Sequence, residues 1–202
     1  MRSFSPHRVS TNIRRRTQRH GLISRLFLVT LLCIFPLGAI AESAAGPEIS
    51  GEFRLVEHTG RAVDKHSYDG KLRLVFFGFT DCPLICPTTM AEVARAMRLL
   101  ESSEKQVQPL FITIDPHTDT IERLAEYVPL FHPSITGLTG SDDQIRDAAR
   151  GFGAVYGKGE GENATIFHSS YLYLMDRDGE FLDLFGYGTD AKTIAAKLRE
   201  YL

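Results

Sequence analysis

Two short apolar runs, separated by one amphipathic segment, constrain the fold of this chain more than any other feature. The runs are Leu72–Phe77 (LRLVFF) and Val107–Ile114 (VQPLFITI), and each has the length of a buried strand. Between them, apolar side chains recur with helical spacing on one face: Met90, Val93, Ala94, Met97 and Leu100. Two strands joined through a helix pair in parallel, because the chain must cross over the sheet to return. The sequence therefore predicts a βαβ unit in the middle of the chain.

The segments on either side of this unit predict a mixed sheet with more helices. The expected elements are a β-hairpin over 53–63, a helix over 121–128 that Pro129 ends, a helix opened by the capping box Ser141–Gln144, a β-hairpin over 171–185 and a last helix from Thr189. Glycines at 157, 159 and 161 indicate a mobile loop. This order is that of an α/β chain with a thioredoxin-like fold, extended by an N-terminal β-hairpin and an extra helical insertion.

The first 41 residues have the features of an export signal. A basic stretch ends at Arg25, and a 16-residue apolar run, Leu26–Ala41, follows it. That run is shorter than the ~20 residues that cross a hydrocarbon core, and Ala39-Ile40-Ala41 is typical of a signal-peptidase site. We predict a cleaved signal peptide over 1–41, with an uncleaved membrane anchor as the alternative, then a linker over 42–50 and one domain over 51–202.

The charge distribution supports export and argues against one class of partner. Residues 1–41 hold seven basic residues and no acidic ones, whereas the rest of the chain carries 16 Lys+Arg against 25 Asp+Glu. A basic N-terminal end stays on the inner side of a membrane, so we expect a periplasmic protein, either soluble or tethered to the bacterial inner membrane. Phosphate binding needs clustered Lys and Arg, so we expect no nucleic acid partner.

The two cysteines of the body lie where sites form in open α/β sheets. Cys82 and Cys86 follow the first apolar strand and precede the helix that starts near Pro87. Free N–H groups at a helix start stabilise a thiolate, so we expect a lowered pKa for Cys86. A structural disulfide is the alternative in an oxidising compartment, but closing so short a loop stabilises little. We interpret the pair as functional, either redox-active or metal-binding.

A third group bears on the choice between redox and metal chemistry. His168 precedes the strand Ser170–Met175, a position that can return beside the start of the helix. Two cysteines and one histidine form a soft set suited to Cu(I), and to Cu(II) with a weak further ligand. Zinc is the competing metal, but a structural zinc site uses four ligands and the sequence shows no fourth cysteine or histidine for it. Asp81 and Asp115 are possible oxygen donors, although turn and cap roles are more usual.

Four motifs in order resemble those of a known family. The stretch Phe76–Met90 (FFGFTDCPLICPTTM) resembles the signature of the Sco/SenC copper chaperones. The resemblance continues through Ile114–Thr120, Gly137–Ser141 and His168–Asp176, and it covers residues 50–202.

This resemblance implies a thioredoxin-like metallochaperone that binds copper through Cys82, Cys86 and His168. It implies that copper, as Cu(I) and also as Cu(II), is delivered to the binuclear copper site of a respiratory cytochrome c oxidase, or that the protein prepares that site. The expected partner is therefore the copper-site subunit of the oxidase or another copper protein. Members of the family are also discussed as thiol–disulfide reductants of that site's cysteines. We expect the chain to act as a monomer, either soluble or tethered to the inner membrane.

Three positions depart from the common pattern of the family. Leu84 and Phe167 stand where the family often has Asp, and Asp81 replaces a frequent His. Apolar surroundings tune a metal site, so we predict that Leu84 and Phe167 make a drier site that favours Cu(I).

The rival hypothesis is a thiol–disulfide oxidoreductase or a peroxidase-type redox protein that uses Cys82 and Cys86. The usual redox motif is C-x-x-C, whereas three residues separate the cysteines here. Thioredoxin-like reductants also resemble one another in a cis-proline ahead of the late hairpin. No proline follows Pro133, and His168 stands in that region instead.

Overall fold

A computed structural model describes residues 49–159 and 166–202. The predicted signal or anchor over 1–41 and residues 42–48 of the predicted linker lie outside the described residues. Within the described part of the chain, no helix combines the length and apolar character needed to cross a bilayer.

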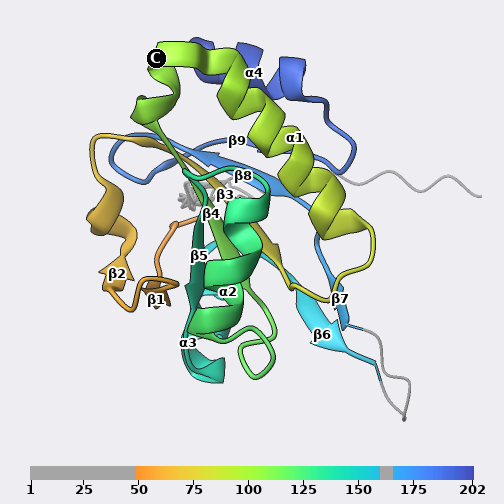
Figure 1. The fold of residues 1–202 in the computed structure, drawn as a ribbon. Helices are drawn as coiled ribbons and strands as arrows, with labels where there is room; N and C mark the ends of the chain where they lie inside the picture. Colours follow the sequence, from red (N-terminus) through yellow and green to blue (C-terminus); the bar gives the residue numbers. More distant parts are fainter. Residues whose placement is uncertain (1–48, 160–165) are drawn as a thin grey trace, which may run out of the picture. The chain divides into compact units, whose positions relative to one another are not determined.

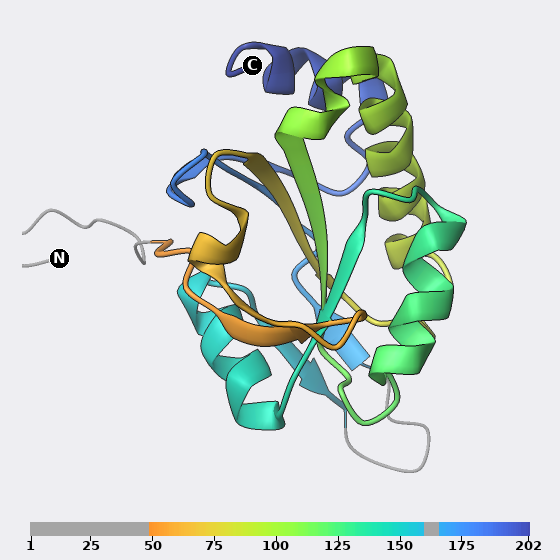
Figure 2. The same cartoon turned by 60° about the vertical axis from the view of Figure 1, so that its left-hand side comes forward.

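Seven strands form the central sheet (Figures 1 and 2). Across the sheet they are β2 (Ala62–Asp64), β1 (Arg54–Glu57), β5 (Thr136–Thr139), β4 (Val107–Thr113), β3 (Leu72–Gly78), β8 (Leu172–Met175) and β9 (Phe181–Phe185). β3 pairs in parallel with β4, and β4 in parallel with β5, whereas the other neighbours are antiparallel. The predicted parallel unit and both predicted hairpins are confirmed.

In the part of the chain that the structure describes, four α-helices cover the two faces of this sheet. They are α1 (Ile85–Leu100), α2 (Ile121–Tyr127), α3 (Asp142–Gly151) and α4 (Ala191–Arg199). Short 3-10 turns occur at η1 (Lys65–Tyr68), η2 (Glu101–Gln106) and η3 (Val128–Leu130). α1 packs along α4, and α3 lies on the other side of the sheet from α1 and α2 (Figures 1 and 2). The order β4-β3-β8-β9 with α1 and α4 on one face is the thioredoxin-like core, to which the β1–β2 hairpin and the segment from α2 to α3 are added.

Packing follows the periodicities of the sequence. β3 is buried along its whole length, so it lies at the centre of a sheet covered on both faces. The predicted apolar face of α1 is buried at every position: Met90, Val93, Ala94, Met97 and Leu100. On the opposite face of the sheet, the rings of Phe77, Phe152 and Tyr173 stack edge to face with centroids 5.3–6.2 Å apart. These two layers hold the carboxyl end of β3 and the start of α1 in fixed positions.

The ends of the helices depend on local capping. The predicted capping box forms at α3, where the Ser141 hydroxyl accepts from the N–H of Gln144 and the Gln144 side chain accepts from the N–H of Ser141. α4 begins two residues after the predicted Thr189, because the carboxylate of Asp190 accepts from the N–H groups of Lys192 and Thr193. α2 ends at Tyr127, just before η3, which contains Pro129.

Two features of the fold are absent from the sequence-based expectations. One is β5, and the other is a separate two-stranded sheet of β6 (Tyr156–Lys158) and β7 (Ile166–His168). Gly157 lies in β6 and pairs with Phe167, so the prediction of a loop at Gly157 was wrong, whereas Gly159 follows the strand and Gly161 lies outside the described residues. The Phe167 ring lies against this glycine, since a Cβ at position 157 would come within 2.6 Å of it.

Candidate metal centre

The cysteines lie at the junction of β3 and α1. α1 begins at Ile85, two residues earlier than Pro87, so Cys86 belongs to the first turn of the helix. The N-cap residue Leu84 offers no side-chain acceptor to this turn. Instead the N–H of Cys86 donates to the sulfur of Cys82 over 3.3 Å. Cys82 therefore partly caps the helix that carries Cys86.

Cys86 is held by the core of the protein. Its side chain is fully buried, and a Cβ placed on Gly78 would lie 2.8 Å from its sulfur and 2.9 Å from the ring of Phe111. Only glycine at position 78 therefore leaves room for the sulfur at the end of β3. Cys82 is 9% exposed and therefore lies closer to the surface than Cys86.

The expected lowering of the Cys86 pKa was wrong. Burial raises the pKa of this thiol well above its usual range, and the neighbouring Cys82 and Asp119 raise it further. A thiolate in apolar surroundings loses its hydration. This loss outweighs the stabilisation offered by the free N–H groups at the start of α1. Without a cation, Cys86 is a neutral thiol at pH 7.

His168 reaches the cysteines from the separate β6–β7 sheet. It is the last residue of β7, and its Nε2 lies 3.6 Å from the sulfur of Cys86. Its Nδ1 lies 3.0 Å from the carbonyl oxygen of Ser169, which can only accept, so the proton sits on Nδ1 and the Nε2 lone pair faces the sulfur. The rings of Phe76 and Phe79 lie edge-on to the imidazole, with centroids 5.9 and 6.0 Å away.

Burial lowers the pKa of His168, and the hydrogen bond to Ser169 offsets this only in part. The imidazole is therefore neutral at pH 7, which is the form that binds metals.

The structure brings the three predicted ligand residues together. The ligand atoms of Cys82, Cys86 and His168 all lie within 4.8 Å of one another, and both cysteines are free thiols. Across residues 49–159 and 166–202, this is the one group of three or more His, Cys, Asp or Glu side chains close enough to hold a metal ion. Two thiolates and an imidazole fit a soft ion such as Cu(I).

The possible oxygen donors do not join this group. Asp81 forms an ion pair with Arg123, and Asp115 lies outside the cluster. The set therefore has three members, which differs from the four ligands of a structural zinc site.

The two apolar residues next to the ligands are exposed. Leu84 is 63% exposed and Phe167 is 56% exposed. Neither encloses the ligands, and the dry surroundings of the site come from the burial of Cys86 and the rings around His168.

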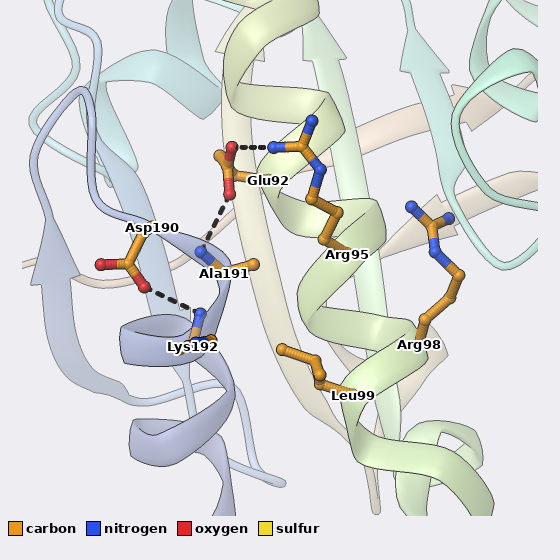
Figure 3. Close-up of a pocket in the computed structure, with 7 residues that line it drawn as sticks. All are labelled: Glu92, Arg95, Arg98, Leu99, Asp190, Ala191 and Lys192. Atoms are coloured by element: carbon orange, nitrogen blue, oxygen red, sulfur yellow. Dashed lines mark hydrogen bonds and ion pairs between the residues drawn. The ribbon is translucent and has the colours of Figure 1, made fainter.

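A depression in the surface between α1 and α4 lies apart from this cluster (Figure 3). In it, the Glu92 carboxylate accepts from the N–H of Ala191 and pairs with Arg95, while Asp190 caps α4. The bond between Glu92 and Ala191 joins the two helices to each other, so we assign the depression a structural role.

Two residues that shape the site were missed by sequence reasoning. Gly78 makes room for the Cys86 sulfur, and Asp119 is a buried carboxylate bonded to the loop before Cys82. Asp119 lies inside the motif Ile114–Thr120, which was the available signal for it. Gly78 had no signal beyond its place at the end of an apolar run.

Comparisons with known proteins identify the family of this chain. The SCO1/SenC family matches residues 41–202. The human "Protein SCO2 homolog, mitochondrial" is 37% identical over 169 residues, which cover 81% of this chain and 62% of the human protein. This chain therefore spans less than two thirds of the length of that relative.

Solved structures extend the comparison to the fold. Arabidopsis thaliana ScoI with copper bound superposes with a TM-score of 0.71 at 35% identity, over 76% of this chain and 97% of that one. A second structure is that of BsSco, described as a member of the Sco family of cytochrome c oxidase assembly proteins in which a disulfide switch was identified. It superposes with a TM-score of 0.63 at 26% identity, over 78% of this chain and 94% of that one. From the match over most of its length, the shared fold and the Cys82, Cys86 and His168 cluster, this chain belongs to the SCO1/SenC family.

Proposed function

We propose that this protein binds copper through Cys82, Cys86 and His168 and delivers it to, or prepares, the binuclear copper site of a respiratory cytochrome c oxidase. The observation that carries the proposal is the convergence of two sulfurs and one imidazole nitrogen within 4.8 Å. The copper bound in the ScoI structure and the description of BsSco as an oxidase assembly protein support it.

The donor set suits a cargo that must be held tightly and then released. Soft thiolates favour Cu(I), and Cu(II) is bound with a weak further ligand. His168 is already neutral and has its Nε2 lone pair facing the sulfur, whereas Cys86 must lose its proton when the metal arrives. The protein therefore exchanges a thiol proton for copper.

The proposed setting of this chemistry follows from the sequence of residues 1–41. The basic stretch and apolar run there support export across the bacterial inner membrane, with the domain soluble in the periplasm or tethered by the apolar segment. The recipient is the copper-site subunit of the oxidase or another copper protein, and the domain acts as a monomer.

The second candidate function is thiol–disulfide exchange by Cys82 and Cys86. The contact between the N–H of Cys86 and the sulfur of Cys82 places the two residues side by side, and BsSco has a disulfide switch. Attack on a disulfide or a peroxide requires a thiolate. The burial that raises the Cys86 pKa opposes this reaction for Cys86, so Cys82 is the attacking residue in this alternative.

An anaerobic titration with Cu(I) against a competing chelator tests the proposal. We expect one tight equivalent in the reduced protein and a clear loss of affinity in His168→Ala. Binding that does not respond to His168→Ala would contradict the three-residue site. Turnover of insulin or peroxide that survives His168→Ala would favour the redox function instead.

The delivery step is tested by mixing the copper-loaded protein with the metal-free copper-site domain of an oxidase. We expect the recipient, once separated from the donor, to have gained copper. A recipient that gains copper no faster than from free Cu(I) would contradict delivery.

A further inference from the structure

We propose that Asp119 is a positioning residue that fixes the loop bearing Cys82 and thereby sets the copper affinity of the site. This inference rests on the proposed copper-binding function and adds a residue that does not touch the metal.

The carboxylate of Asp119 is buried and fully engaged. Its side chain is 1% exposed. Oδ1 accepts from the hydroxyl of Thr80 over 2.5 Å, while Oδ2 accepts from the N–H of Thr80 over 3.0 Å and from the hydroxyl of Thr113 over 2.6 Å. Three hydrogen bonds to one buried carboxylate form a strong local anchor, because bonds to an ionised group are about twice as strong as neutral ones.

The neighbouring groups fix the direction of these bonds. The Nε–H of Arg123 donates to the Thr80 hydroxyl over 2.6 Å, so the proton of that hydroxyl is left to point at Asp119. In the same way the N–H of Asp115 donates to the Thr113 hydroxyl over 3.0 Å. A carboxylate has only acceptors and matches all three donors, whereas an amide replaces one acceptor with a donor.

Asp119 connects the cysteine loop to the sheet. It lies between β4 and α2, and its carbonyl oxygen accepts from the hydroxyl of Thr139 on β5 over 3.1 Å. Thr80 lies two residues before Cys82, and the turn between them is closed by the bond from the N–H of Cys82 to the carbonyl of Phe79. The ion pair of Arg123 with Asp81 holds the same loop from outside.

Among the three ligand residues, Cys82 depends most on this anchor. Cys86 is fixed by α1 and by its contact with Gly78, and the imidazole of His168 is fixed by Ser169. Cys82 lies on a loop outside any helix or strand, so the position of its sulfur follows the position of that loop. Groups that orient metal ligands typically contribute about 10- to 100-fold to metal affinity.

The test compares Asp119→Asn with Asp115→Asn in the full-length protein. Both variants remove one carboxylate from the segment between β4 and α2, but the side chain of Asp115 makes none of the hydrogen bonds that tie Asp119 to Thr80 and Thr113. We expect the Cu(I) affinity to fall about 10- to 100-fold in Asp119→Asn and to stay near the wild-type value in Asp115→Asn.

A second readout needs no metal. In the reduced, metal-free protein, the alkylation rates of the two cysteines are measured separately by mass spectrometry. We expect Asp119→Asn to speed the alkylation of Cys82 about tenfold or more and to leave that of Cys86 unchanged. An equal acceleration at both cysteines would show general loosening of the fold and would overturn a positioning role. Rates and affinities equal to those of Asp115→Asn would overturn it as well.

A pair of Thr80 variants keeps the test decisive if Asp119→Asn does not fold. Thr80→Ser keeps the hydroxyl that donates to Asp119, whereas Thr80→Val keeps the shape and removes the hydroxyl. We expect Thr80→Val to resemble Asp119→Asn and Thr80→Ser to resemble the wild type, and identical behaviour of the two would overturn the inference. If the wild type bound no copper, the proposed function would fail, while the alkylation rates would still test the anchor.

Discussion

The two sides of the metal cluster are built in different ways. The cysteine side belongs to the core, because Cys86 is fully buried at the start of α1 and lies against Gly78 of the central strand β3. The histidine side belongs to β7, a three-residue strand in a sheet separate from the main one. One ligand is thus fixed by the packing that folds the domain, whereas another is held by local contacts. A substitution at His168 should therefore lower metal affinity with little effect on fold stability, whereas a substitution at Cys86 should lower both.

The strongest test of this difference removes each ligand in turn. We expect Cys86→Ala to reduce Cu(I) affinity by more than about 100-fold, because it removes one of two soft ligands and even groups outside the ligand set contribute about 10- to 100-fold. It should also reduce the free energy of unfolding by about 1 kcal/mol or more, because it leaves a cavity in the core.

The matched variant is His168→Ala, which should lower copper affinity while changing the free energy of unfolding by less than about 1 kcal/mol. Denaturant unfolding of the metal-free proteins measures this. Equal losses of stability in Cys86→Ala and His168→Ala would contradict the difference between the cysteine side and the histidine side of the cluster.

The next effect concerns the close approach of Gly78 to Cys86. We expect Gly78→Ala to destabilise the metal-free protein by about 1–3 kcal/mol, because the added methyl group overpacks the core against the sulfur and the Phe111 ring. Thermal unfolding measures this, and Gly186→Ala is the control, since a Cβ at position 186 meets nothing within 4 Å. If Gly78→Ala left the stability unchanged, the core would not fix Cys86 tightly.

The pH dependence of copper binding should also come from the cysteine side. Burial raises the pKa of the Cys86 thiol, so below that pKa copper must displace its proton, and affinity should rise about tenfold per pH unit for each proton released. Burial lowers the pKa of His168, so near pH 7 and above the imidazole binds without losing a proton. Titrations between pH 7 and pH 8 should therefore show the same slope in the wild type and in His168→Ala. A smaller slope in the variant would assign a released proton to the histidine.

The smallest effect is expected at the exposed residues beside the ligands. Leu84 and Phe167 are more than half exposed, so the double change Leu84→Asp/Phe167→Asp should act mainly through its added negative charge. We expect a modestly lower Cu(II)/Cu(I) potential, because anionic groups near the site favour the more highly charged ion. Voltammetry of the copper-loaded proteins measures this, and an unchanged potential would mean that charges at these exposed positions do not influence the copper.

The long periodic elements of this fold could be predicted from the sequence. β3, β4 and α1 each contain enough residues for their apolar pattern to be distinctive, and the position of Cys82 and Cys86 after β3 followed from them. β5, β6 and β7 have three or four residues each, and unlike the equally short strands β1, β2 and β8 none of them adjoins a hairpin turn sequence such as His58-Thr59-Gly60.

The parts that could not be predicted depend on contacts between distant residues. The start of a helix can be recognised in a sequence, but the depth at which Cys86 is buried cannot. The direction predicted for the shift of the Cys86 pKa was therefore wrong. Asp119 and Thr80 are 39 residues apart, and only the folded chain brings them together. The position of His168 was predicted more successfully, because a strand that pairs with β3 returns the chain to the same edge of the sheet.

X-ray absorption spectroscopy at the copper edge tests whether Cys82, Cys86 and His168 together bind the copper. It would be recorded on the reduced full-length protein loaded with one equivalent of Cu(I), beside His168→Ala. We expect two sulfur neighbours and one nitrogen neighbour in the wild type, with the nitrogen lost in the variant. A wild-type spectrum with sulfur neighbours alone, or a nitrogen neighbour that survives in His168→Ala, would contradict a site made by Cys82, Cys86 and His168.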